Sequence, residues 1–475
     1  MSVSGTDERR AVWLITAIAA VSRLAALAQP MRYDESVTWA YFVGKPWHVV
    51  VSSYQFPNNH VFFSLLAKVT SSLAPFQPWA LRLPAFLAGV AIVPLTWAVG
   101  RRFASPRVGL LGAALTAVST PLILYSTNAR GYSLVVALFL VMLLLASDVL
   151  ATGRIRCWVA LAVVGALGLY TVPVMLYPLG IVAVWLILGA RGAQGDAALR
   201  LIGGAILSSA VAGAIALGLY LPIIRTAGLG ALTGNRFVEP STWREFFGAL
   251  PAHGVDTLLT WTDPLPWPAA LVVGVVAMLG VRRKAPSERA SLAAAAASWC
   301  GVLLLVTHRV PFVRVWLFLL PLFLLAVARG AMRIAERLSP RRPVPAITPI
   351  AVAVLLGAYA VIARPAEASN DTGAFRPASR VTSRLTAELR PGDRVLAPIP
   401  TNGPLLYYFS AQGLDTALLN TPPPLTRRVF LVLDPARGRT VEWAVQVGMI
   451  DPRQFLQPER LLQEPEVELW RSVRR

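Results

Sequence analysis

Residues 132–151 read YSLVVALFLVMLLLASDVLA, a run of twenty residues in which Asp148 carries the single charge. About 20 consecutive, mainly apolar residues are enough for an α-helix to cross the ~30 Å hydrocarbon core of a bilayer. The run therefore predicts a transmembrane helix.

Similar runs occur on both sides of this one. Hydrophobic residues make up 56% of the 475-residue chain and charged residues only 14%, whereas about 25% of an average soluble chain is charged. These values exclude a disordered chain, a fibrous protein and an ordinary soluble enzyme. Residues 157–190 are compatible with two helices or with one long broken helix. We expect a polytopic all-α membrane protein with about eleven transmembrane helices, near residues 11–29, 84–100, 108–124, 132–151, 157–170, 173–190, 201–224, 267–281, 291–306, 314–328 and 345–363.

The net charge of +20 comes from 44 basic and 24 acidic residues. The chain has no basic stripe interleaved with stacking aromatic residues, so we expect no nucleic-acid partner. Every loop expected on the cytoplasmic side is basic, as the positive-inside rule requires. The pattern predicts a multi-pass protein of the plasma (inner) membrane with a cytoplasmic N-terminus. The first apolar run is long for a signal peptide, and no clear cleavage site follows it.

Two regions of the chain differ from the predicted transmembrane helices in their sequence pattern. The first outer loop, residues 30–83, contains three tryptophans and an apolar run at 61–69, which indicates helices lying in the membrane interface. Residues 365–475 alternate between predicted helices and strands, which indicates a small extracytoplasmic α/β domain. We therefore expect a transmembrane catalytic domain at 1–364 and a second domain at 365–475. Its strands are expected at 394–399, 428–434 and 467–473.

An acidic pair stands out, because acids are scarce before residue 365. Asp34 and Glu35 directly follow the first apolar run, on the face expected to lie outside the cytoplasm. Ionisable residues at membrane depth are costly and usually functional. The pair is thus a candidate catalytic site, and the alternative is a solvated pair at a helix end.

Two polar clusters lie on the same face. Asn59 and His60 could bind hydroxyl groups, although helix capping alone also explains an asparagine before a helix. The turn at 125–132 has Arg130 as its only charge. That arginine could hold a phosphate through paired hydrogen bonds, or it could extend to the interface.

A third polar cluster, residues 308–314, contains His308, Arg309 and Arg314. Arginines on the outer face run against the usual charge bias, and a phosphate at the membrane surface would explain them. The four histidines of the chain match no metal-binding spacing, so we expect no metal site.

Taken in order, these residues resemble a known family. The motifs are Tyr33-Asp34-Glu35, Asn58-Asn59-His60, Leu81-Arg82-Leu83-Pro84, the 125–132 turn, Leu169-Tyr170-Thr171, Val313-Arg314-Val315-Trp316, Arg390-Pro391-Gly392-Asp393 and Leu405-Leu406-Tyr407-Tyr408. They are similar to motifs of bacterial relatives of protein O-mannosyltransferases and lipid A aminoarabinose transferases, which are glycosyltransferases of the GT-C superfamily. The chain departs from the family pattern at Val61 and Val172, where the family often has a proline and a histidine. These departures argue against a histidine-based metal role.

The resemblance implies an enzyme that moves a sugar from a polyprenyl-phosphate carrier to a hydroxyl acceptor on the outer face of the membrane. The acceptor would be a cell-envelope glycan, a glycolipid or a protein. Asp34 would be the general base, and Glu35 would help to position substrate. Arg130 and Arg314 are then candidates for binding the donor phosphate. The candidates for binding substrate are Asn59, His60, Tyr132 and His308.

We expect one displacement with inversion at the anomeric carbon, and disfavour a covalent sugar intermediate on Asp34. No cofactor is expected to be required, and a divalent cation is left as an alternative. The main rival function is a multi-pass lipid or sugar transporter (flippase), and a cell-envelope scaffold is the third. Transporters often consist of repeated halves with broken helices at matching positions, and the sequence has no such repeat.

Overall fold

The computed structural model describes residues 5–55, 59–192, 195–234, 237–281, 291–339, 345, 347–419 and 426–475. The chain divides into two compact units. The first contains Met1–Leu27, Trp47–Ala67 and Arg82–Glu367, and the second contains Ala28–Pro46, Lys68–Leu81 and Ala368–Arg475. The second unit therefore combines the C-terminal region with two segments of the first loop. The domain boundary expected at residue 364 stays a prediction.

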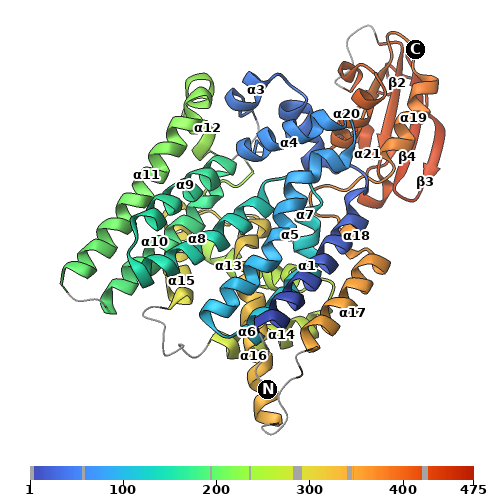
Figure 1. The fold of residues 1–475 in the computed structure, drawn as a ribbon. Coiled ribbons are helices and arrows are strands. Elements are labelled where there is room, and N and C mark those ends of the chain that lie inside the picture. The colour runs from blue at the N-terminus through green and yellow to red at the C-terminus, as the bar shows by residue number, and fades with distance from the viewer. Residues whose placement is uncertain are drawn as a thin grey trace. The chain divides into compact units, whose positions relative to one another are not determined.

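The first unit is helical (Figure 1). The boundary between the units falls within α4 (Val61–Leu73) and α5 (Pro78–Phe103). The other elements of the first unit are α1 (Gly5–Leu27), α3 (Trp47–Ser52), α6 (Pro106–Val118), α7 (Thr120–Ser126), α8 (Tyr132–Thr152), α9 (Ile155–Thr171), η2 (Pro173–Met175), α10 (Leu176–Gly189), η3 (Ala190–Gly192), α11 (Asp196–Ala227), α12 (Gly230–Thr233), α13 (Trp243–Trp261), α14 (Trp267–Val281), α15 (Leu292–Thr307), η4 (Val313–Leu319), α16 (Leu320–Leu338) and α17 (Thr348–Ala363). The short helix α18 (Pro365–Ala368) ends with the first residue of the last segment of the second unit.

Each of the eleven expected spans falls on apolar helix. Among the described residues, six helical segments are long and apolar enough to cross a membrane, and the bent pair α6–α7 would be a seventh. The six are α1, α5, α8, α10 with its flanking turns, α11, and η4 with α16. The other four expected spans correspond to α9, α14, α15 and α17, which have 15 to 17 residues. A polytopic all-α membrane fold is confirmed, whereas the number of spans stays a prediction.

Two interruptions of the helices follow from the sequence. Residues 157–190 form two helices, because Val172 is extended and Pro173 begins the short turn η2. The α6–α7 pair bends by 61°. Ser119 is extended between the two helices, and Pro121 has no N–H with which to bond the carbonyl of Ala117 four residues earlier.

A buried arginine of α1 supplies the missing donor at this bend. Arg23 is fully buried, and its Nη1 donates to the Ala117 carbonyl at 2.7 Å. Its Nε donates to Ser126 Oγ, at the end of α7, at 3.2 Å. The same guanidinium therefore bonds both arms of the bent pair and fixes the end of α7, from which the 127–131 turn departs.

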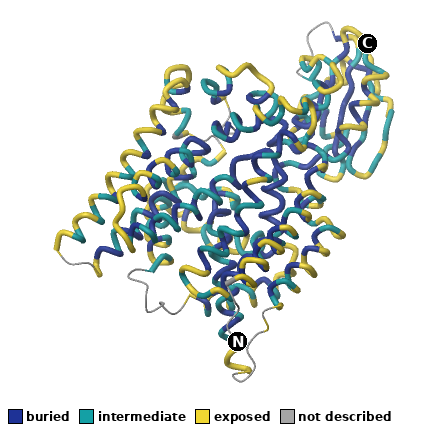
Figure 2. The backbone as a smooth tube through the Cα atoms, viewed as in Figure 1, coloured by how far each residue is buried: buried dark blue, intermediate teal, exposed yellow. Residues whose placement is uncertain are grey.

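Buried hydrophobic residues of α5, α7, α8, α10 and η4 form one core cluster of the first unit, and Figure 2 shows much of this region in dark blue. Phe139 and Leu143 of α8, Leu186 of α10 and Phe318 of η4 are all buried within it. The helix α11 is mostly exposed by comparison (Figure 2). Large apolar side chains lie exposed along it, as expected for a helix that faces lipid.

The second unit contains a four-stranded sheet in the order β1-β2-β4-β3. β1 and β2 are parallel, and the other two pairs are antiparallel. Residues Leu405, Phe409, Phe430 and Leu469 are buried in its core. The elements are α2 (Tyr33–Thr38), η1 (Trp39–Val43), α19 (Ala378–Glu388), β1 (Arg394–Leu396), α20 (Asn402–Ala411), η5 (Thr416–Leu418), β2 (Arg428–Leu433), η6 (Pro435–Arg437), α21 (Val441–Gln446), β3 (Glu459–Glu464) and β4 (Val467–Val473).

The predicted α/β character of this region is confirmed, and sequence reasoning missed β3. Its sequence, ERLLQE, lacks the alternation of a half-buried strand, because β3 is a largely solvated edge strand.

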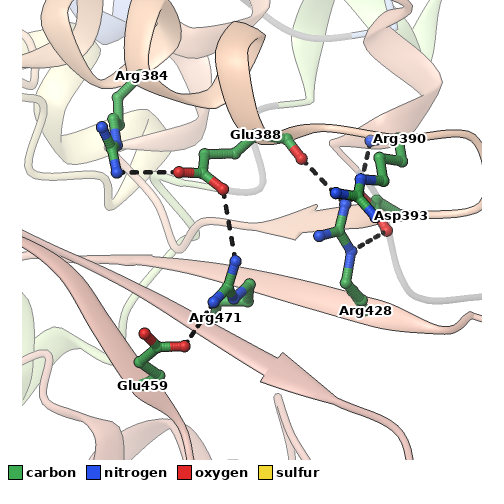
Figure 3. Close-up of polar contacts among 7 residues, drawn as sticks. All are labelled: Arg384, Glu388, Arg390, Asp393, Arg428, Glu459 and Arg471. Atoms are coloured by element: carbon green, nitrogen blue, oxygen red, sulfur yellow. Dashed lines mark hydrogen bonds and ion pairs between the residues drawn. The ribbon is translucent and has the colours of Figure 1, made fainter.

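A polar network ties the helix α19 to the sheet (Figure 3). Glu388 accepts from Arg384 at 2.9 Å and from Arg471 of β4 at 3.5 Å. Arg428 of β2 binds both carboxylate oxygens of Asp393, at 3.0 and 2.6 Å. Such bidentate pairs fix geometry as well as adding energy. The network therefore holds β1, β2 and β4 in register at one end of the sheet.

We predict that Arg23→Met lowers the thermal unfolding midpoint of the purified protein in detergent. The variant leaves the Ala117 carbonyl buried without a donor, which typically costs about 1–3 kcal/mol. The matched control is Arg156→Met, because Arg156 is an exposed arginine of α9. Equal midpoints for the two variants would contradict the role given to Arg23.

Candidate functional site

His60 and Arg130 form a buried polar centre in the first unit. His60 immediately precedes α4, and Arg130 lies in the turn between α7 and α8. The two residues are 1% and 2% exposed. Gly131 permits the approach of these segments, because a Cβ atom there would lie 2.5 Å from Thr171 Cγ2 and 2.9 Å from His60 Nδ1. The turn thus depends on a residue without a side chain.

The hydrogen bonds of His60 define its tautomer. The backbone N–H of Gly131 donates to His60 Nδ1 at 2.8 Å, so this nitrogen carries no proton. Burial, followed by the charges of Arg130 and Arg314, lowers the pKa of His60 well below its ordinary value of 6.5. A neutral imidazole has a single N–H. His60 is therefore neutral at pH 7, with its proton on Nε2.

This tautomer leaves Arg130 without an acceptor among the described residues. Its Nη2 lies 3.2 Å from His60 Nε2, but both nitrogens then carry hydrogen, so the contact gives Arg130 no bond. Its Nε and Nη1 are buried and make no hydrogen bond either. A buried cation of this kind is costly unless an anion or strong acceptor joins it. The centre is therefore suited to binding an anion.

A cavity of about 250 Å³ opens on this centre. Three arginines line it, namely Arg130, Arg309 and Arg314. Three tyrosines line it as well, namely Tyr54, Tyr132 and Tyr177. The remaining lining is mainly apolar and includes Val172, Leu176 and Phe312. The cavity thus offers positive charge beside an apolar wall.

Of the eight residues expected to form the site, four lie together at this cavity: His60, Arg130, Tyr132 and Arg314. Arg314 lies on η4 with its guanidinium carbon 4.3 Å from the centre of the Phe312 ring. The Tyr132 ring lies 5.0 Å from the His60 ring and 5.8 Å from the guanidinium carbon of Arg130. Sequence reasoning missed Tyr54 and Tyr177 as lining residues, because a single tyrosine in a loop or an apolar helix carries no motif.

Asn59 and His308 lie in different surroundings from those four. Asn59 is fully buried; its amide donates to the carbonyls of Val50 and Ser53, and its Oδ1 accepts from Ser64. His308 ends α15 with a positive φ of 49°, and its ring centre lies 3.8 Å from that of Trp243. Both residues thus pack against protein groups, and their binding of substrate stays a prediction.

Asp34 and Glu35 belong to the second unit, on the first turn of α2. Both are buried. Glu35 Oε1 accepts from the backbone N–H of Arg32 at 2.9 Å, as a capping residue does. The helix is six residues long. The structure thus shows Glu35 stabilising the turn that carries Asp34, while the catalytic role of the pair stays a prediction.

Metal ligands are not gathered anywhere in the described part of the chain. No group of three or more His, Cys, Asp or Glu side chains there could hold an ion. The expectation that no metal is required stays a prediction.

The sequence matches one known family over part of its length. Residues 59–224 match the family described as dolichyl-phosphate-mannose-protein mannosyltransferase. The segment contains His60, Arg130 and Tyr132. No curated protein sequence matches the chain.

The fold is similar to that of several solved structures. ArnT from Cupriavidus metallidurans in the apo state has 12% identity and a TM-score of 0.57, with 97% of each chain covered. ArnT from the same organism bound to undecaprenyl phosphate has 13% identity, the same score and the same coverage. The oligosaccharyltransferase of Archaeoglobus fulgidus in complex with Zn and sulfate has 10% identity and a TM-score of 0.52, over 96% of this chain and 72% of the other. The resemblance seen in the sequence is confirmed.

The pKa of His60 predicts a pH dependence of stability. As the pH falls below about 6.5, the unfolded chain binds a proton at His60 and the folded protein does not. The free energy of unfolding should therefore be unaffected by His60 above that pH, and should fall below it by up to ~1.4 kcal/mol per pH unit. We expect His60→Gln to reduce the loss in thermal midpoint between about pH 7.5 and 5. The exposed His48→Gln serves as the control, and equal slopes for the two variants would contradict the assignment.

Proposed function

We propose that the chain is a membrane glycosyltransferase of the GT-C type, and that it transfers a sugar from a polyprenyl-phosphate carrier to a hydroxyl acceptor; the family match over residues 59–224 and the similar solved folds support this proposal. The acceptor classes are a cell-envelope glycan, a glycolipid or a protein. We place the reaction on the outer face of the plasma membrane, with the N-terminus cytoplasmic and the C-terminal α/β region outside. This placement rests on the basic loops of the sequence.

The observation that carries the proposal is the buried guanidinium of Arg130. It faces a cavity with two further arginines, and its Nε and Nη1 have no acceptor among the described residues. A phosphate is the anion that a planar guanidinium binds best through paired hydrogen bonds. The apolar side of the cavity suits the first carbons of a prenyl chain, and one solved structure of similar fold holds undecaprenyl phosphate.

Arg130 and Arg314 would act on the leaving group. In the reaction, the acceptor oxygen forms a bond to the anomeric carbon while the bond from that carbon to the phosphate oxygen breaks. Negative charge gathers on the departing polyprenyl phosphate. Hydrogen-bond donors already aimed at that position lower the barrier without reorganising. His60, kept neutral by its burial and by the nearby arginines, would donate its Nε2–H toward the same anion.

Asp34 would be the general base that takes the proton of the acceptor hydroxyl, a role that rests on the sequence resemblance. One displacement of this kind inverts the anomeric centre. Glu35 would act through its hydrogen bond to the Arg32 backbone by fixing the first turn of α2. Tyr132 would bind substrate beside Arg130, as expected from the sequence.

The donor sugar can be found by offering the purified protein a panel of polyprenyl-phosphate sugars. A ligand that binds the folded state raises its thermal midpoint by linkage. The sugar that stabilises the protein most, beyond polyprenyl phosphate alone, identifies the donor. Mannose, an arabinose-type sugar, galactose and glucose form the starting panel.

We predict that Arg130→Gln weakens binding of undecaprenyl phosphate by about 10–100-fold, because a hydrogen bond to a charged group contributes about 1.5–3 kcal/mol. Binding is measured on the purified protein in detergent with labelled lipid. Arg154→Gln is the control, because Arg154 is an exposed arginine between α8 and α9. Unchanged binding by Arg130→Gln would overturn the phosphate site.

We predict that Asp34→Asn abolishes sugar transfer while binding of undecaprenyl phosphate is kept. Loss of a general base typically costs ~10²–10⁴-fold in rate. Covalent transfer is measured with the donor found above, and Asp415→Asn, at an exposed acid of the same unit, is the control. Near wild-type transfer by Asp34→Asn would exclude Asp34 as the base.

The rival function, a transporter, is tested with the wild-type protein in vesicles. If the protein moves the donor across the vesicle membrane without forming a glycosylated product, it is a transporter.

A further inference from the structure

The helix that carries Asp34 cannot hold its shape alone. α2 (6 residues) and the π-helical turn η1 (5 residues) that continues it together remain shorter than the about 12–15 residues below which isolated helices are marginal in water. Its conformation must therefore come from tertiary contacts. Those contacts lie within the second unit and are made largely by the C-terminal α/β region.

The first contact satisfies the N-terminus of α2. The N–H groups of a first helical turn have no partner within the helix. The N–H of Tyr33 donates to the Gly373 carbonyl at 2.9 Å, and the N–H of Asp34 donates to the Thr372 carbonyl at 3.2 Å. Thr372 and Gly373 both have left-handed backbones, with φ of 62° and 77°. We call residues 369–373 the docking turn.

The second contact is made by Arg32, the residue just before α2. Its exposed fraction is 2%. Its Nη1 donates to the carbonyls of Ser369 and Asp371, both at 2.8 Å. Its Nε and Nη2 donate to Gln29 Oε1 at 3.1 and 3.0 Å. One guanidinium thus clamps the start of α2 to the docking turn.

The third contact comes from α20. Gly403 lies so close to α2 that a Cβ atom there would be 2.5 Å from Tyr33 Cδ2. The hydroxyl of Tyr408 accepts from the backbone N–H of Met31 at 3.2 Å. α20 is itself anchored in the core of the sheet by Leu405 and Phe409. The position of α2 is therefore set by the fold of the sheet.

The docking turn is tied to the sheet as well. Arg437, just after β2, donates from Nη2 to the Ala374 carbonyl at 2.9 Å. Arg376 donates to the Ala368 carbonyl at 2.7 Å and pairs with Glu466, next to β4, at 2.7 Å. Both ends of the turn thus connect to strand ends of the same sheet.

We propose that the C-terminal α/β region is a positioning element for Asp34, and that Arg32 is its principal positioning residue. The proposal rests on the role of Asp34 in the proposed function. According to the proposal, the α/β region affects the chemical step itself, because it fixes the position of the Asp34 carboxylate. Misplacement of a catalytic group by about 1 Å can cost ~10²-fold in rate.

The first test compares Arg32→Gln, Arg32→Lys and Arg380→Gln in the full-length protein. Arg380 is the control, because it forms an exposed ion pair with Glu464 in the same unit. We expect Arg32→Gln to lower kcat by about 10–100-fold, with KM for the donor unchanged. Arg32→Lys should recover part of kcat, since an ammonium can still donate to one carbonyl of the docking turn. Arg380→Gln should behave as wild type.

Undecaprenyl phosphate serves as the probe that separates misplacement from misfolding. Each variant should bind it with wild-type affinity and stoichiometry, because Arg130 lies in the first unit. A loss of stoichiometry equal to the loss of kcat would overturn the proposal, since it would mean that Arg32 only supports folding. Wild-type kcat in Arg32→Gln would also overturn it, while inactivity of Asp34→Asn would leave the proposed function standing.

A second variant reaches α2 from the opposite side. Gly403→Ala inserts a methyl group against Tyr33 without touching the Arg32 clamp. We expect the same fall in kcat with unchanged KM and binding. Gly213→Ala on α11 is the matched control, because no atom lies within 4 Å of a Cβ placed there. If Gly403→Ala keeps wild-type kcat, contact with α20 does not position Asp34, and the proposal fails.

Discussion

A buried guanidinium whose Nε and Nη1 have no acceptor among the described residues is the constraint on which the polar centre of the first unit depends. Arg130 is excluded from water, and the adjacent imidazole of His60 is held with its proton facing it. The cost of burying such a charge has to be offset by a ligand or by another part of the structure. The fold supports this arrangement through Gly131, which lets two segments meet, and through Arg23, which fixes the helix before the turn. Neither residue touches the cavity, yet both define where Arg130 lies.

The helices could be predicted from the sequence because apolar runs of sufficient length have few alternatives to burial in lipid. The positions of all eleven expected runs agree with helices, but the length of a run does not say whether it crosses a bilayer. Helices such as α14, with 15 residues, are short for a crossing, and their tilt depends on packing partners that no local pattern encodes. The bend at Ser119 lies inside a single apolar run, and the hydrophobic pattern of that run does not indicate it. The strand β3 was missed because an edge strand buries little and so needs little hydrophobic pattern.

The residues of the candidate site show a different limit of prediction from sequence. Sequence identifies which side chains could bind a substrate, but not whether their hydrogen bonds are already used. Asn59 looked like a binding residue and has its amide fully occupied by backbone and Ser64. The sequence offered no means of telling Arg130 from Asn59, yet Nε and Nη1 of Arg130 have no hydrogen-bond partner among the described residues. Tyr54 and Tyr177 became apparent only once folding had brought distant segments to one cavity.

The docking of α2 also has a consequence for how the protein is made. The carbonyls that Arg32 binds lie 337 and 339 residues further along the chain. During synthesis the N-terminal segments emerge first, and domains usually fold in that order. Here the loop bearing Asp34 must wait until nearly the whole polypeptide has been translated and its last hundred residues have folded. The segment that carries Asp34 is therefore completed late in biogenesis, and a chain that stops before the sheet is formed would insert its helices without gaining an ordered α2.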